Sequence, residues 1–96
     1  MRIRWHHLAL EDLQHLRAYI ARDHPRAAAT VAQRILEAVE RLPEHPAMGR
    51  PGRVPDTREL VIAGTPYIVP YRVMGDTLVI LRVLHGAMRW PEAFDA

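Results

Sequence analysis

The sequence predicts an α+β fold made of an N-terminal strand, a helical hairpin and then an antiparallel three-strand meander. Three segments near the C-terminal end are rich in Val, Ile, Leu and Tyr, with glycine-containing gaps between them: residues 58–63, 67–73 and 77–84. Two longer segments before them repeat apolar residues at helical spacing. With 96 residues, of which 49% are hydrophobic, the chain can form a single domain, residues 1–96, around one modest core.

Two different periodicities predict the first strand and the first helix. Residues 2–5 alternate polar and apolar side chains, which indicates a strand. Leu13, Leu16 and Ile20 then recur at spacings of three and four residues, which indicates a helix. The chain therefore begins with a strand and continues into a helix.

A second helix begins at Pro25, because proline suits the first helical position, and Asp23 or His24 can cap its N-terminus. It ends before Pro43, and its apolar stripe is Ala28, Val31, Ile35, Val39 and Leu42. The two helices form a hairpin that must bury its stripe against one face of a mainly antiparallel four-stranded sheet. Six side chains should make this contact: Leu13, Leu16, Ile20, Val31, Ile35 and Val39.

Residues 43–57 hold six prolines and glycines, so we expect an irregular connection there. A tight turn at Gly75-Asp76 would pair Arg72 with Val79 and Arg82 with Val69. In that register, the odd-numbered residues of 67–73 share a face with the even-numbered residues of 78–84. Pro70 removes a ladder donor and so indicates a bulge or a sheet edge.

Composition limits the possible functions. The formal net charge is +2, and Arg2 and Arg4 account for it, because arginines and acidic residues balance in the rest of the chain. This balance does not indicate a general nucleic-acid-binding face. The chain has no cysteine, no long apolar segment and no apolar leader, so we expect a cytoplasmic protein that does not enter the membrane. The adjacent His6 and His7 lack the spacing of a metal site, and nothing indicates a cofactor.

Several short stretches, taken in this order, resemble the RelE/ParE superfamily of toxins from bacterial type II toxin–antitoxin modules. They are Glu11-Asp-Leu, Tyr19-Ile-Ala, Glu44-His-Pro-Ala-Met-Gly-Arg50, Arg58-Glu-Leu, Tyr71-Arg-Val and Ile80-Leu-Arg-Val-Leu-His-Gly86. The resemblance covers nearly the whole chain. It implies a growth-arresting toxin, of the kind found in plasmid stabilisation systems, that a cognate antitoxin neutralises.

One branch of this superfamily, the RelE-like mRNA interferases, cleaves messenger RNA on the ribosome without a metal. This chemistry needs a proton-transfer group and an array of cations. In this chain the resemblance would assign Glu59 as base, His85 as acid, and Arg82 or Arg58 as the charge stabiliser. Much of the usual basic array is replaced, because Ile68 stands where arginine is usual and Glu59 and Val61 replace a lysine pair.

The other branch, the ParE-like toxins, inhibits DNA gyrase and needs no catalytic residues. The long helical hairpin and the His-Pro-x-Met-Gly-Arg connection favour this branch. The candidate target contacts are then Arg50, Arg53, Arg58, Arg89 and Trp90. A third hypothesis is that the chain is a non-toxic protein-interaction module.

Each candidate residue also has a structural explanation. His85 could cap the sheet through a backbone hydrogen bond, and Arg82 could pair with Glu59 or with an acid on the helices. Trp90 and Phe94 could be packing residues. The arginines of residues 50–58 could belong to a solvated loop.

Overall fold

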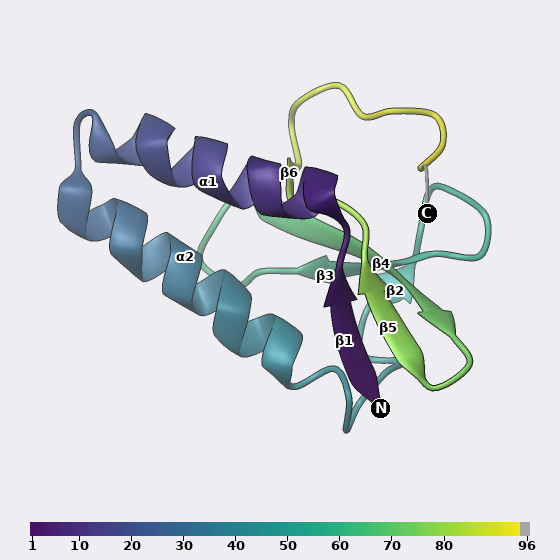
Figure 1. Ribbon diagram of the computed structural model, residues 1–96. Helices are drawn as coiled ribbons and strands as arrows, with labels where there is room; N and C mark the ends of the chain where they lie inside the picture. Colours follow the sequence, from purple (N-terminus) through teal and green to yellow (C-terminus); the bar gives the residue numbers. More distant parts are fainter. Residues whose placement is uncertain (95–96) are drawn as a thin grey trace.

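The computed structural model describes residues 1–94 and contains two helices that cover one face of a single sheet (Figure 1). The elements are β1 (Arg2–Trp5), α1 (His7–Ala21), α2 (Pro25–Glu40), β2 (Arg50–Pro51), β3 (Arg58–Val61), β4 (Tyr67–Met74), β5 (Thr77–Ile80) and β6 (Leu84–His85). This order confirms the predicted α+β class. The connection 43–57 is not wholly irregular, because Arg50 and Pro51 form β2 against β3.

A side-chain cap marks the beginning of α1, and a proline marks the beginning of α2. The His6 ring caps α1, because its Nδ1 accepts a hydrogen bond of 3.1 Å from the Leu8 N–H. Of the two candidate caps of α2, His24 holds the N-cap position, but its side chain makes no capping hydrogen bond, and Pro25 follows as the first helical residue. The turn between the helices is therefore short, and the helices run side by side.

The hairpin buries its stripe as predicted. Leu16, Ile35 and Val39 are buried in the main core, and Leu13, Ile20 and Val31 pack against it, which confirms the six predicted contacts. The far end of the hairpin extends beyond the sheet (Figure 1), and Tyr19, near that end, is 70% exposed.

The strand order is β1-β5-β4-β3-β2, with β6 also paired to β4. Only the β1–β5 pair is parallel among the described strands, so the sheet is mainly antiparallel as predicted, although it has six strands instead of four. The residues Tyr67, Val69 and Tyr71 belong to the core under the helices, and we call their side the helix face. The opposite side is the outer face.

The predicted pairing of Arg72 with Val79 is confirmed, but the pairing of Arg82 with Val69 is wrong. The Leu81 N–H donates to the Pro70 carbonyl over 3.0 Å, but Pro70 has no N–H to return the bond. Strand β5 therefore ends at Ile80. Pairing with β4 resumes in β6, where His85 lies opposite Tyr67, one residue out of the register of the β4–β5 pair. This interruption is the irregularity predicted from Pro70, and it occurs inside the sheet.

The extra residue reverses the predicted faces beyond Leu81. Val83 joins the core under the helices with Leu78 and Ile80, whereas the uninterrupted register placed it on the opposite face. A one-residue slip exchanges the two faces because side chains alternate along a strand.

Tyr71 attaches the connection to the helix face of the sheet. Its hydroxyl donates to the Pro46 carbonyl over 2.7 Å and accepts from the Gly49 N–H over 2.9 Å. A Cβ on Gly49 would lie 2.6 Å from a ring carbon of Tyr71, so only glycine allows this close approach. Burial raises the pKa of the Tyr71 phenol above 10.0, and the hydrogen bond from Gly49 and the charge of Arg58 partly oppose this shift. Burial also raises the pKa of Tyr67, with a smaller contribution from Tyr19.

We expect Tyr71→Phe to lower the free energy of unfolding by about 1–3 kcal/mol, because it leaves a buried N–H and a carbonyl without their partner. In the wild type, stability should be constant up to about pH 10 and then fall, since the unfolded chain releases its tyrosine protons before the folded chain does. The chain contains no lysine or cysteine, so few other groups titrate there. Urea denaturation between pH 7 and 11 tests both points, and Tyr71→Phe should lose less stability above pH 10. Equal effects from Tyr71→Phe and the exposed control Tyr19→Phe would contradict this role.

Candidate functional site

Glu59 is the centre of the charged site on the outer face. It lies on β3 and is only 2% exposed. Its Oε1 accepts hydrogen bonds from Arg50 Nε and Nη2 at 3.3 and 3.1 Å, and its Oε2 accepts one from the Arg53 N–H at 2.7 Å. Arg53 Nε lies 3.7 Å from Oε2 and completes the compensation of the buried charge. Glu59 therefore fixes the loop that follows β2.

The C-terminal segment lies against the same loop. The Arg53 guanidinium carbon lies 3.7 Å from the centre of the Trp90 ring, in a cation–π contact. Trp90 Nε1 also donates to the His85 carbonyl over 3.1 Å, so Trp90 is a packing residue. In Figure 1 this yellow segment arches from β6 toward the loop between β2 and β3. Phe94 lines a hollow of about 220 Å³ with His6, Leu8, Leu81, Arg82, Pro91 and Ala93.

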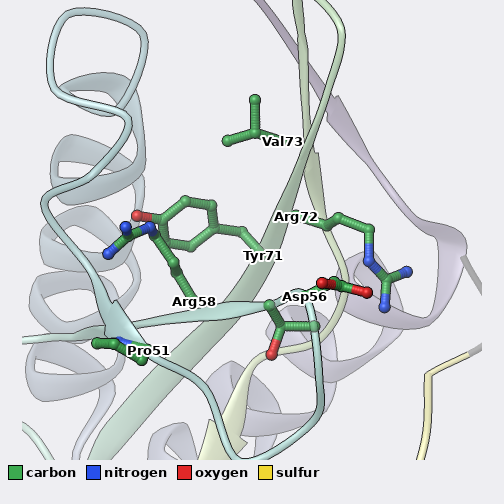
Figure 2. A pocket seen from close by; sticks show the side chains of 7 residues that line it. Pro51, Asp56, Arg58, Tyr71, Arg72 and Val73 are labelled. Carbon is green, nitrogen blue, oxygen red and sulfur yellow. The ribbon is translucent and has the colours of Figure 1, made fainter.

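Arg58 holds the connection from its other side. Its Nη1 donates to the Gly49 carbonyl over 2.7 Å and approaches the Ala47 carbonyl at 3.5 Å. It also lines a pocket of about 500 Å³ with Pro51, Asp56, Thr57, Tyr71, Arg72 and Val73. Figure 2 shows Arg58 and Arg72 on opposite sides of this pocket, with Asp56 near Arg72.

Arg82 is held by a carboxylate on α1. Its Nε and Nη2 donate to the two oxygens of Asp12 over 2.7 and 3.0 Å, and Asp12 Oδ2 also accepts from the Val83 N–H over 3.0 Å. This is the ion pair with a helix acid that the sequence left open. Asp12 was not singled out from the sequence, because its partner lies 70 residues away.

His85 makes a local contact with the backbone. Its Nδ1 accepts from the Ala87 N–H over 3.1 Å, and its ring meets Tyr67 edge to face with the ring centres 5.6 Å apart. This is the capping arrangement that the sequence suggested.

The structure does not bring Glu59 and His85 together. Glu59 lies opposite Pro70 and His85 lies opposite Tyr67, and directly paired residues share a face. Because Tyr67 and Pro70 are three residues apart on β4, their side chains leave opposite faces. Glu59 therefore points to the outer face and His85 to the helix face.

The five candidate target contacts fall into two groups. Arg50 and Arg53 contact Glu59 on the outer face, and Trp90 lies against Arg53. The side chains of Arg50 and Arg53 are 53% and 48% exposed. Arg58 lies on the other side of the connection, and Arg89 is exposed in the C-terminal segment. We call Arg50, Arg53, Glu59 and Trp90 the arginine cluster. It presents cations that are fixed in place yet still accessible.

Neither a metal site nor a membrane span is found in residues 1–94. No group of three or more His, Cys, Asp or Glu side chains there could hold a metal ion. No helix in that range is long and apolar enough to cross a membrane.

Comparison with known proteins gives one family. The family model described as the ParE toxin of the type II toxin–antitoxin system parDE matches residues 3–90. Y4kP of Sinorhizobium fredii, which is named as a toxin, is 53% identical over 91 residues, covering 95% of this chain and 94% of that protein. Toxin RelE2 of Caulobacter vibrioides is 37% identical over 83 residues, covering 86% of this chain and 92% of that protein. A solved chain of the chromosomal ParDE TA system from P. aeruginosa superposes with a TM-score of 0.82 at 31% identity, covering 88% of this chain and 95% of that chain.

We expect Glu59→Gln to lower the free energy of unfolding by about 1–3 kcal/mol, because it removes the charge that compensates Arg50 and Arg53 and places an amide among their donors. Urea denaturation followed by circular dichroism measures this loss. Glu40→Gln, at an exposed position on α2, is the control and should change stability by less than about 0.5 kcal/mol. Similar small changes in both variants would contradict the anchoring role of Glu59.

Proposed function

Because the chain belongs to the ParE toxin family of type II toxin–antitoxin systems, we propose that it arrests growth by binding and inhibiting DNA gyrase, and that a cognate antitoxin neutralises it. Inhibition of gyrase by binding requires a rigid surface and no catalytic group. The arginine cluster is such a surface, because its cations are fixed by a buried carboxylate.

The position of Glu59 is the observation that carries this proposal. A general base must reach the proton that it abstracts. Here the carboxylate is buried and accepts hydrogen bonds from Arg50 and from the Arg53 N–H. The side chain of the candidate acid, His85, points to the helix face, opposite to that of Glu59. This geometry supports binding over cleavage of RNA.

The state of Arg82 adds to this argument. A residue that stabilises charge in a transition state must be able to reach the reacting phosphate. Arg82 makes a two-pronged contact with Asp12 instead. Releasing it would leave the partly buried Asp12 without its cation.

Ribosome-dependent cleavage of messenger RNA is the second candidate function. The Caulobacter vibrioides relatives favour it by name, since three toxins called RelE are 32–37% identical to this chain. Of the residues assigned to that chemistry, Arg58 lines the pocket of about 500 Å³ with Tyr71 and Arg72, and neither Glu59 nor His85 lines it.

The two mechanisms differ in what fails first after induction. We expect loss of gyrase-dependent supercoiling and DNA damage signalling within minutes, while translation continues at first. Plasmid topology and pulse labelling of new protein measure the two effects in the same culture. Prompt loss of translation with A-site cleavage and intact supercoiling would contradict gyrase inhibition, and unaffected growth would favour a non-toxic interaction module.

His85→Ala gives a matched test of catalysis. If gyrase inhibition is the mechanism, this variant should arrest growth as the wild type does at equal folded protein. A nuclease would instead lose about 10²-fold or more of its cleavage rate with its general acid. Cleavage of ribosome-bound messenger RNA by the purified wild type and variant separates the two results.

Arg89 lies in the exposed C-terminal segment beside the arginine cluster, and we propose that it contacts the target. Arg89→Ala should weaken inhibition of purified gyrase by about tenfold, the scale of an interface arginine. Arg22→Ala removes an equally charged, exposed residue at the far end of the hairpin and should leave inhibition unchanged. Equal inhibition by both variants would exclude Arg89 from the contact.

A further inference from the structure

The pocket of about 500 Å³ between Arg58 and Arg72 lies at a short stretch of β4 edge that β3 leaves open. Arg58 lies opposite Tyr71, so Asp56 would lie opposite Val73 if the pairing continued. Asp56 has a φ of 62°, in the left-handed region, and the chain turns away there. On this side, the edge of β4 at Val73 therefore pairs with no strand in residues 1–94.

The loop before β3 is hydrogen-bonded within itself. The Thr57 N–H donates to the Val54 carbonyl over 3.3 Å, and the Thr57 carbonyl accepts from the Gly52 N–H over 2.8 Å. The Thr57 hydroxyl also donates to the Val54 carbonyl, over 2.7 Å. The loop therefore forms a wall of the pocket beside β4 instead of extending the ladder.

The open edge presents a main-chain N–H group to the pocket. The Pro70 carbonyl accepts from the Leu81 N–H, so the main-chain groups of Pro70 face β5. Backbone groups alternate in direction along a strand. Those of Arg72 therefore also face β5, while the N–H of Val73 faces the pocket that Val73 lines.

An arginine reaches the pocket from each face of the sheet. Arg58 lies opposite Tyr71 and so belongs to the helix face, whereas Arg72, the next residue on β4, belongs to the outer face. Figure 2 shows these two side chains on opposite sides of the pocket. The hydrogen bonds of Arg58 within residues 1–94 use Nη1 alone, so its Nε and Nη2 can donate to a ligand.

We propose that this pocket binds the phosphate group of a phosphomonoester, carried by a nucleotide or by the 5′ end of a nucleic-acid strand. Such a phosphate has three terminal oxygens and a charge of about −1.5 to −2 at pH 7. The pocket offers three donor groups, the Val73 N–H and the guanidinium groups of Arg58 and Arg72, and guanidinium suits phosphate geometry. A carboxylate has only two oxygens and one charge, so the donor set favours phosphate.

The size and charge of the pocket agree with this ligand. Its volume of about 500 Å³ falls within the range of about 300–1,000 Å³ that is usual for small-molecule sites, so it admits more than a lone phosphate. Asp56 lies near Arg72 and carries a negative charge, but the two arginines exceed it (Figure 2). The inference goes beyond gyrase inhibition, and it stands or falls separately because it concerns a small ligand.

Calorimetric titration of the purified chain with adenosine monophosphate tests the phosphate contact. We expect this probe to bind at least about tenfold more tightly than adenosine, and Arg72→Gln to weaken its binding about tenfold or more, because a charge-assisted hydrogen bond is lost. The control, Arg17→Gln, makes the same change of charge at an exposed position on α1 and should stay within about twofold of the wild type. Equal binding of the two probes, equal effects of the two variants, or no binding of adenosine monophosphate would each overturn the proposal.

Asp56→Asn should act in the opposite direction, which a loss of folding cannot imitate. Asparagine tolerates the left-handed backbone, so the turn is kept. Without the negative charge, adenosine monophosphate should bind about two- to fivefold more tightly at low ionic strength. Asp23→Asn, at an exposed position between the helices, is the control and should leave affinity unchanged. Unchanged or weaker binding by Asp56→Asn would contradict the site.

Amide NMR spectra locate the phosphate. The Val73 amide signal should shift during the titration with the midpoint found by calorimetry, and saturable binding that leaves this signal unmoved would overturn the proposal. A single strand with a 5′-phosphate is then compared with adenosine monophosphate and with the same strand ending in a hydroxyl. Tightest binding of the phosphorylated strand supports a nucleic-acid end as the ligand, and no gain over adenosine monophosphate supports a free nucleotide.

Discussion

The buried carboxylate of Glu59 is the constraint on which the outer half of the molecule depends. A charge that is almost wholly removed from water must be compensated by hydrogen bonds and cations. Arg50 and the main chain of Arg53 supply these, and both belong to the long connection between the helices and the sheet. The compensation therefore folds the connection over the outer face. Arg53 in turn stacks on Trp90, so the same carboxylate indirectly places the C-terminal segment.

Tyr71 fixes the same connection from the helix face, and the two anchors act on neighbouring residues. The tyrosine hydroxyl binds the main chain at Pro46 and Gly49, while Glu59 binds the side chain of the next residue, Arg50. Segment 46–53 is thus attached to both faces at one end of the sheet. A connection rich in proline and glycine becomes a defined surface for this reason, although few of its residues belong to regular structure. The cations that it carries keep half of their surface in solvent.

Patterns between near neighbours could be read from the sequence, and contacts between distant residues could not. The apolar stripe from Ala28 to Leu42, the N-cap position of His24 and the pairing of Arg72 with Val79 were each predicted. Each depends on residues that are close in the chain or joined by a tight turn. The one-residue slip in register places Val83 in the core, and it depends on how β4 pairs again after Pro70. The periodicity of the sequence does not show this. Among the candidate site residues, Arg50, Arg53 and Trp90 were named from the sequence by residue type alone. The contacts of Arg50 and Arg53 with Glu59, and of Trp90 with Arg53, require a sheet, a loop and the C-terminal segment together.

The break at Pro70 also explains why Arg82 is committed to a structural contact. Because Pro70 has no N–H, it cannot donate a hydrogen bond to the Leu81 carbonyl, and the regular pairing of β4 with β5 ends there. The Val83 N–H therefore needs another acceptor. Asp12 supplies it from α1, and a carboxylate brought into a partly buried place needs a cation. Arg82, one residue earlier, is that cation. The side chain that the superfamily resemblance marks as a charge stabiliser for RNA cleavage is therefore required, in this chain, by a defect in its own sheet. Use of Arg82 by an active site would leave Asp12 uncompensated, a cost that the binding mechanism proposed above does not incur.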